Sequence, residues 1–261
     1  MSGMLSEIKS ALAGLSLGPI QYFDTVNSTN DIAADWVLRG APDLSLVIAD
    51  EQVAGRGRQG RRWHTPPGAA LAVSLILRPA PPGDVIPLGR YAALGALAVH
   101  QALAEGYGLP ASIKWPNDVL LGREKVCGVL AEAGWVGDQP EGLVLGIGVN
   151  VAPGAIPPPN ELRFPATSVE SFLGYALNRW ELLAKILAGV LVWRARLPAP
   201  DFVQEWEARL AFRGEVVRLG EVEGTLAGLS PEGHLRLETA TGVQAFPVGD
   251  LSLRPVDSAR K

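Results

Sequence analysis

Residues 55–63 read GRGRQGRRW and combine three glycines with four arginines. The glycines match the G-x-G-x-x-G spacing of a dinucleotide-binding turn, which requires a strand before it and a helix directly after it. An apolar run at residues 44–49 predicts the strand. Pro66 and Pro67 disfavour the helix, because proline removes a backbone donor and restricts the residue before it. The glycine spacing is therefore incidental.

The four arginines of this loop admit two other interpretations. A solvated basic loop is the simpler one. Glycine beside arginine, however, lets the backbone curl around a small anion while guanidinium groups bind it, and Trp63 adds a flat apolar face. The chain as a whole has a net charge of −4, which disfavours general nucleic-acid binding. We therefore expect the loop to bind a small ligand that carries a phosphate or a carboxylate.

The composition limits what else the chain can be. With 261 residues and 48% hydrophobic residues, it is long enough for one large domain and a small appendage. Its one cysteine, Cys127, excludes an intrachain disulfide, and its three histidines are too far apart to suggest a zinc site. The N-terminus lacks the pattern of a signal peptide, and no stretch is apolar enough to cross a membrane. We expect a cytoplasmic protein.

The pattern around the loop predicts an α+β fold. Ser28 fits the N-cap of a helix that Gly40 ends. A proline-rich loop is expected at residues 152–165. From residue 213 the pattern changes to short β segments with turns, which predicts a small β-barrel and a division into residues 1–212 and 213–261. Further strands are expected at residues 70–77, 112–115, 125–135 and 143–151, further helices at 88–105, 179–196 and 201–210, and the barrel strands at 215–219, 224–229, 234–238 and 243–248.

Two more segments carry chemistry-bearing residues after predicted strands. In KWPND at residues 114–118, Pro116 favours a turn that presents Lys114 to a cleft, although an exposed lysine at a strand end explains it as well. The second segment is GIGVN at residues 146–150, and Gly128 lies in a further predicted strand. Glycines there permit the close approach of a ligand or simply tight strand packing.

Four blocks of the sequence stand in a fixed order: STN at residues 28–30, QVAGRGRQGRRW at 52–63, KWPND at 114–118 with KVCG at 125–128, and GIGVN at 146–150. Together they resemble the biotin–protein ligase family, and the resemblance spans nearly the whole chain. It implies a mixed-sheet catalytic domain of the class II synthetase-like type over about residues 20–210, followed by a small SH3-like β-barrel.

The resemblance implies that ATP, with Mg²⁺, activates biotin to biotinyl-5′-AMP. The biotinyl group then passes to a lysine of a biotin carboxyl carrier protein of an acyl-CoA carboxylase. Activation joins two anions, so it requires fixed positive charge more than a protein nucleophile. The implied catalytic residues are Lys114, Arg56 and Arg58; the implied biotin-binding residues are Ser28, Thr29, Asn30, Gln52, Gly57 and Gly128; the implied ATP- and adenylate-binding residues are Arg56, Gly57, Arg58, Trp63, Lys114 and Asn150. No protein residue is assigned to the metal.

Two rival functions stay open. A lipoate or octanoate ligase resembles these enzymes in fold and chemistry, although the loop with Trp63 and the C-terminal barrel favour biotin. A non-catalytic biotin-binding regulator would not need three charges at Lys114, Arg56 and Arg58. About twenty residues precede the catalytic segment, too few for a helix-turn-helix domain, so we expect no DNA binding, and a homodimer is left open.

Two residues near these motifs each allow two interpretations. Asp118 is a turn residue or the general base of the transfer step. Lys125 is a surface lysine or part of the site.

Overall fold

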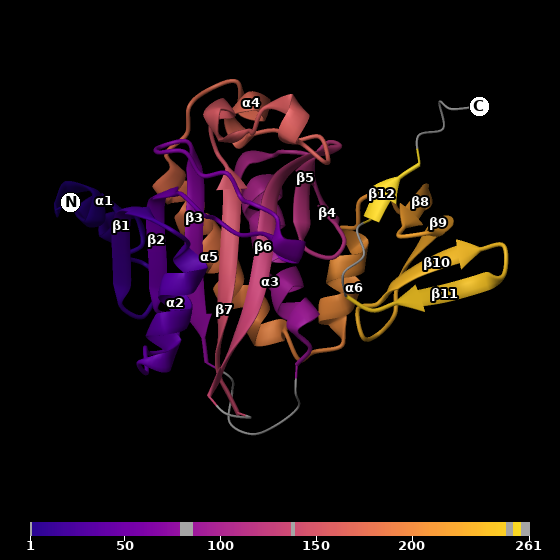
Figure 1. Cartoon of the computed structure of the whole chain (residues 1–261), viewed down its shortest axis with the longest axis horizontal. Coiled ribbons are helices and arrows are strands. Elements are labelled where there is room, and N and C mark those ends of the chain that lie inside the picture. Colours follow the sequence, from indigo (N-terminus) through magenta and orange to yellow (C-terminus); the bar gives the residue numbers. More distant parts are fainter. Residues whose placement is uncertain (1, 79–85, 137–138, 249–252, 257–261) are drawn as a thin grey trace.

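The computed structural model describes residues 2–78, 86–136, 139–248 and 253–256. It contains a seven-stranded sheet with helices on both faces and a separate five-stranded sheet near the C-terminus (Figure 1). This arrangement confirms the predicted α+β fold class. None of the helices in these ranges is long and apolar enough to cross a membrane.

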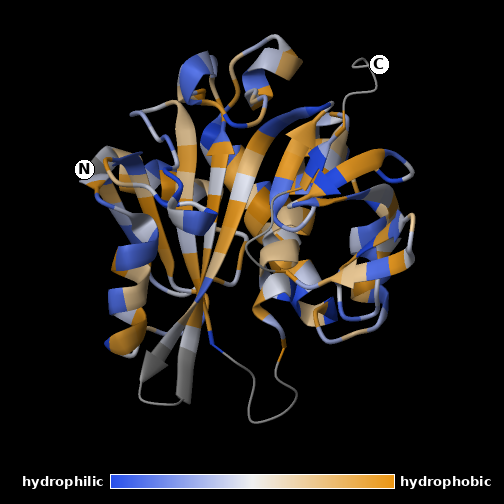
Figure 2. Cartoon of the chain, turned by 45° about the vertical axis from the view of Figure 1, so that its right-hand side comes forward, coloured by the Kyte–Doolittle hydropathy of each residue, from blue (hydrophilic) through white to orange (hydrophobic). Residues whose placement is uncertain are grey.

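The large sheet is mixed and runs in the order β1-β2-β3-β7-β6-β5-β4. Strands β1 and β2 are parallel and the remaining neighbours are antiparallel. The inner strand β3 is buried along its whole length because both of its faces are covered. Figure 2 shows that the inner strands of the sheet are coloured mainly as apolar. The strands are β1 (Ile20–Val26), β2 (Leu46–Gln52), β3 (Ala70–Leu77), β4 (Ala111–Lys114), β5 (Asp118–Leu121), β6 (Glu124–Val136) and β7 (Gln139–Asn150).

Helices α3 and α5 cover one face of this sheet (Figure 1). Helices α3 and α5 pack closely, since a methyl group on Gly189 would come within 3.1 Å of the Ala98 backbone. On the opposite face, α2 buries Ala33 and Val37 against apolar residues of β2, β3 and β7. Because α2 covers only part of that face, the sheet beside it is available for a site. The helices are α1 (Ser2–Ala11), α2 (Thr29–Leu38), α3 (Leu88–Tyr107), α4 (Val169–Leu173), α5 (Arg179–Arg196) and α6 (Asp201–Ala208), with 3-10 turns at Arg58–Gly60, Pro153–Ala155 and Pro159–Glu161.

The second sheet is antiparallel and follows the order β11-β10-β9-β8-β12. Its buried leucines belong to the same apolar core cluster as the large sheet, and hydrogen bonds between described residues add to this attachment. Trp115 Nε1 donates to the Gly233 carbonyl over 3.1 Å, and the Leu229 amide donates to Glu207 over 2.7 Å. The division at residues 212 and 213 stays a prediction. The strands are β8 (Val216–Leu219), β9 (Val222–Leu229), β10 (Leu235–Thr239), β11 (Gly242–Phe246) and β12 (Leu253–Pro255).

The expected helices and strands are present, with ends shifted by at most four residues, and five further helices and strands appear. The sequence analysis missed α1, α4, β1, β5 and β12. The turn after Lys114 occupies residues 115–117, so Asp118 already belongs to β5 and the turn interpretation of that residue was wrong. Ser28 is at the N-cap of α2 as expected, but its side chain makes no capping hydrogen bond. Its hydroxyl is thus not needed by the helix.

Candidate functional site

A row of residues crosses the sheet on the face that α2 partly covers. Lys114 pairs with Asp118, Asp118 with Gly128, Gly128 with Gly148, and Gly148 with Ala72. Directly opposed residues of antiparallel strands point to the same face. The row therefore has two charged side chains at one end and three residues with little or no side chain next to them.

The arginine loop, residues 55–63, folds over this row as a hairpin. The Trp63 amide donates to the Gly55 carbonyl over 2.8 Å, and the Gly57 amide donates to the Arg61 carbonyl over 2.7 Å. A methyl group on Gly55 would come within 2.6 Å of the Trp63 carbonyl oxygen, so this position requires glycine. The glycines of the loop thus shape a hairpin and not a phosphate-binding helix start.

The indole ring of Trp63 lies on the glycines of the row. A methyl group would come within 2.4 Å of the ring from Gly148 and within 3.2 Å from Gly128. In the described part of the chain, the buried Trp63 Nε1 has no hydrogen-bond partner. An unpaired buried donor costs about 1–3 kcal/mol, so this ring position favours a ligand that accepts the bond or displaces the ring.

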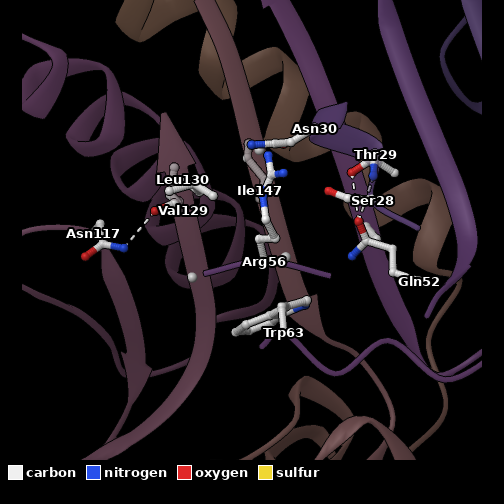
Figure 3. A pocket seen from close by; sticks show the side chains of 14 residues that line it. Ser28, Thr29, Asn30, Gln52, Arg56, Trp63, Asn117, Val129, Leu130 and Ile147 are labelled. Atoms are coloured by element: carbon white, nitrogen blue, oxygen red, sulfur yellow. Dashed lines mark hydrogen bonds between the residues drawn. The ribbon is translucent and has the colours of Figure 1, made fainter. Parts of the chain in front are cut away.

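One hollow beside Trp63 is lined by a hydrogen-bonded network (Figure 3). Gln52 Oε1 accepts from the Thr29 amide over 2.9 Å and from the Thr29 hydroxyl over 3.1 Å. The Ser74 hydroxyl lies 2.8 Å from Thr29 Oγ1 and 2.6 Å from Asn30 Oδ1. Neutral donors and acceptors of this kind suit a neutral polar ring. We call this the network hollow; its lining includes Ser28, Thr29, Asn30, Gln52, Arg56, Trp63, Asn117, Gly128 and Gly146.

The network hollow is nearly closed by Arg56 and Trp63. Its volume is about 40 Å³, close to the space of one water molecule, whereas small-molecule pockets have roughly 300–1,000 Å³. The Arg56 guanidinium forms ion pairs with Asp31 and, over 3.1 Å, with Glu132. Burial lowers the pKa of Arg56, but these two carboxylates more than offset it and raise the pKa. A ring-sized ligand can enter only if Trp63 or Arg56 moves.

The charged end of the row is a triad of buried Lys114, buried Asp118 and half-buried Lys125. Lys114 Nζ lies 2.9 Å and Lys125 Nζ lies 2.6 Å from the carboxylate of Asp118. Burial lowers the pKa of Lys114. Burial alone would raise the pKa of Asp118, but the two lysine charges bring it well below its usual value. Two cationic side chains thus share one carboxylate, and the burial of Lys114 excludes the alternative interpretation of an exposed strand-end lysine.

Arg58 is fastened to the sheet by the KWPND segment. Its NH1 donates to Asn117 Oδ1 over 2.9 Å, while Asn117 Nδ2 donates to the Val129 carbonyl over 2.7 Å. The side chains of Arg58 and Lys114 line the same small hollow next to the network hollow. Two residues from different motifs thus bring positive charge to one place.

A second, wider hollow of about 600 Å³ continues from Trp63 and Lys125. Phe164 at its wall lies under two cations, with Lys114 Nζ 5.0 Å and the Arg254 guanidinium 5.5 Å from the ring centroid. Asn150 is buried here, and its Nδ2 donates to the Thr167 carbonyl over 3.0 Å. We call this the cationic hollow; its basic lining residues are Arg61, Arg62, Lys125, Arg163 and Arg254.

The site shows which predicted residues meet and which do not. Gly57 lines neither hollow, and a methyl group there would meet Arg61 at 3.6 Å, an ordinary contact. All the other predicted site residues line one of these adjoining hollows. Lys125 belongs to the site, which decides between its two interpretations. The sequence analysis missed Glu132, Phe164 and Arg254, because each reaches the site only through long-range folding.

The described residues offer no protein cage for a metal ion. Among them, no three His, Cys, Asp or Glu side chains come together as metal ligands. The buried carboxylate nearest to the cationic hollow, Asp118, is already held by Lys114 and Lys125. A divalent cation that keeps most of its water and phosphate ligands would need at most one or two carboxylates and no such cage.

Comparisons with known proteins agree with this geometry. The model described as "Biotin/lipoate A/B protein ligase family" matches residues 22–150. The biotin--[acetyl-CoA-carboxylase] ligase of Paracoccus denitrificans is 36% identical over 82% of this chain and 93% of its own length. The bifunctional ligase/repressor BirA of Bacillus subtilis (strain 168) is 33% identical over 95% of this chain and 78% of its own length.

The solved structure of the biotin protein ligase from Aquifex aeolicus in complex with biotin and ATP is similar to the whole fold. Its TM-score is 0.79 at 31% identity, and the alignment covers 91% of this chain and 99% of that one. With these identities over most of both chains, the chain belongs to the biotin/lipoate A/B protein ligase family.

Proposed function

We propose that this chain is a biotin–protein ligase that forms biotinyl-5′-AMP from biotin and ATP and transfers the biotinyl group to a lysine of a biotin carboxyl carrier protein. The observation that supports this most is the row from Ala72 to Lys114. It joins a hollow with neutral hydrogen-bonding groups to one with fixed positive charges, as a neutral ring with a carboxylate tail and a triphosphate would require.

In the first step, a carboxylate oxygen of biotin attacks the α-phosphorus of ATP, and the bond to the departing pyrophosphate breaks. Lys114 at the junction and Arg58 beside it reduce the repulsion between the two anions and stabilise the charge of the transition state. Arg56 lies at the mouth of the network hollow and is paired with Asp31 and Glu132. In this proposal it would give up one of these two ion pairs and bind the biotin carboxylate instead. In this mechanism no protein side chain forms a covalent bond to the substrate.

In the second step, the ε-amine of the carrier lysine attacks the carbonyl carbon of the adenylate. An amide bond forms, AMP leaves, and the amine proton passes to the phosphate or to water. The structure argues against Asp118 as the base, because two lysines hold its carboxylate and keep its pKa low. Its role in this proposal is to keep Lys114 and Lys125 in place.

The residue roles in this proposal follow the two hollows. Ser28, Thr29, Asn30 and Gln52 would bind the ureido ring, and Gly128 would lie under the tail once Trp63 moves from it. Trp63, released from the glycines, would stack on the adenine, and Asn150 would lie at the adenine end. Mg²⁺ would arrive on the triphosphate and neutralise part of its charge. The division at residues 212 and 213 stays part of the proposal.

The test is biotin-dependent exchange of labelled pyrophosphate into ATP, with lipoate and octanoate as parallel substrates. We expect exchange with biotin alone, and label from biotin on a carrier domain added afterwards. Exchange with lipoate but not biotin would assign the network hollow to the other branch of the family. Folded protein without exchange for any of the three acids would overturn the enzyme proposal and favour a binding role.

A further inference from the structure

Glu132 has a position that the motifs do not mark. It lies on β6, four residues after Gly128 and on the same face of the sheet. Its register partner on β7 is Val144, which packs against α2. The residue lies behind Arg56 and Asn30 and is not part of the lining of the network hollow. Any role in ligand binding therefore acts through other residues.

The carboxylate of Glu132 joins two segments of the site that are far apart in the sequence. Asn30 Nδ2, at the start of α2, donates to Glu132 Oε2 over 2.6 Å. Arg56 NH2, from the arginine loop, donates to the same oxygen over 3.1 Å and to Oε1 over 3.3 Å. One side chain on the rigid sheet thus holds both the polar wall and the mouth of the network hollow.

The hydrogen bond from Asn30 to Glu132 fixes the orientation of the Asn30 amide and therefore the direction of its bond to Ser74. With Nδ2 committed to Glu132, Asn30 presents Oδ1 to the Ser74 hydroxyl at 2.6 Å. A serine hydroxyl has one hydrogen, and both Asn30 Oδ1 and Thr29 Oγ1 lie within reach of it. The acceptor at Glu132 therefore fixes the group that Asn30 offers to Ser74, and through Ser74 it affects the hydrogen bonds of Thr29.

We propose that Glu132 is a positioning residue that sets biotin affinity by orienting Asn30 and Arg56 together. The inference rests on the proposed function. Asp31 offers a matched comparison, because it pairs with Arg56 as well, whereas the side-chain amide of Asn30 donates to Glu132. Removing Asp31 takes one charge from Arg56, whereas removing Glu132 also releases the network.

The experiment compares Glu132→Ala, Glu132→Gln and Asp31→Asn in pyrophosphate exchange and in direct biotin binding by calorimetry without ATP. Glu132→Ala is expected to weaken biotin binding and raise the KM for biotin about tenfold, with the KM for ATP unchanged. Glu132→Gln is expected to recover most of this loss, because its amide oxygen still accepts from Asn30. Asp31→Asn should change the KM for biotin less than threefold.

Two results would overturn the inference. One is a Glu132→Ala variant with normal biotin binding and a normal KM for biotin. The other is equal loss for biotin and ATP together with a lower thermal midpoint, which is the pattern of a residue needed only for stability. If the unsubstituted protein shows neither exchange nor biotin binding, the proposed function fails first and the inference fails with it.

Discussion

The two hollows hold their side chains in different ways. In the network hollow, Thr29 and Asn30 are held by hydrogen bonds to Gln52, Ser74 and the carboxylate of Glu132. In the cationic hollow, five basic side chains line the same space as the two carboxylates of Asp118 and Glu161, so positive charge is in excess. The first arrangement recognises shape and bond direction, and the second recognises charge. A change in one hollow should therefore affect one substrate and spare the other.

The largest effect is expected for Lys114→Met, at the junction of the hollows. Loss of this charge should lower kcat for biotin-dependent exchange by about 10²–10³, because it removes a donor aimed at the developing charge. Thr29→Val is the matched change on the other side and should raise only the KM for biotin, by a few-fold. Steady-state exchange kinetics for both substrates would measure this.

Folding is the control for that comparison. Asp118 keeps Lys125 as a partner in Lys114→Met, so the protein should still fold, as a thermal melt would show. A Lys114→Met variant that keeps its kcat would contradict the electrostatic role of the junction.

A smaller effect is expected for Gly146→Ala in the network hollow. The added methyl would come within 2.2 Å of Asn30 Oδ1, so Asn30 would have to leave Ser74 or Glu132. The KM for biotin should rise about five- to tenfold while the KM for ATP stays the same. Gly154→Ala is the control, since its methyl would meet only the Ala69 side chain at 3.7 Å. A rise in both KM values would show that the hollows are not independent.

The smallest effect is expected from alkaline pH. Burial lowers the pKa of Lys114 below the ordinary 10.5, so its charge is complete at low pH and is lost as pH rises through the lowered value. The fall in kcat should therefore begin at a lower pH than an ordinary lysine, which is still about nine-tenths protonated at pH 9.5, would give. In Lys114→Arg the fall should be absent. An identical alkaline limb in both proteins would assign it to another group.

Site residues that lie in contiguous motifs could be predicted from the sequence, whereas residues that reach the site only through long-range strand pairing could not. The arginine loop, KWPND and GIGVN carry their residues as contiguous motifs, and those residues line adjoining hollows. Asp118 was misread because a carboxylate after Pro-Asn is typical of a turn, while pairing with β4 and β6 draws it into a strand. Arg254 lies in the second sheet, and only the attachment of that sheet brings it to Phe164. Short strands such as β5, with four residues, give too little periodicity to recognise.

The position of the one cysteine allows the local opening of β6 to be measured. Cys127 lies on β6 between Lys125 and Gly128, is fully buried, and burial raises the pKa of its thiol. Such a thiol is chemically silent until its strand separates from its neighbours. The rate at which a thiol reagent labels the native protein therefore measures how often β6, the strand beneath both hollows, separates from its neighbours. A ligand that bridges β6 to α2 would lower this labelling rate.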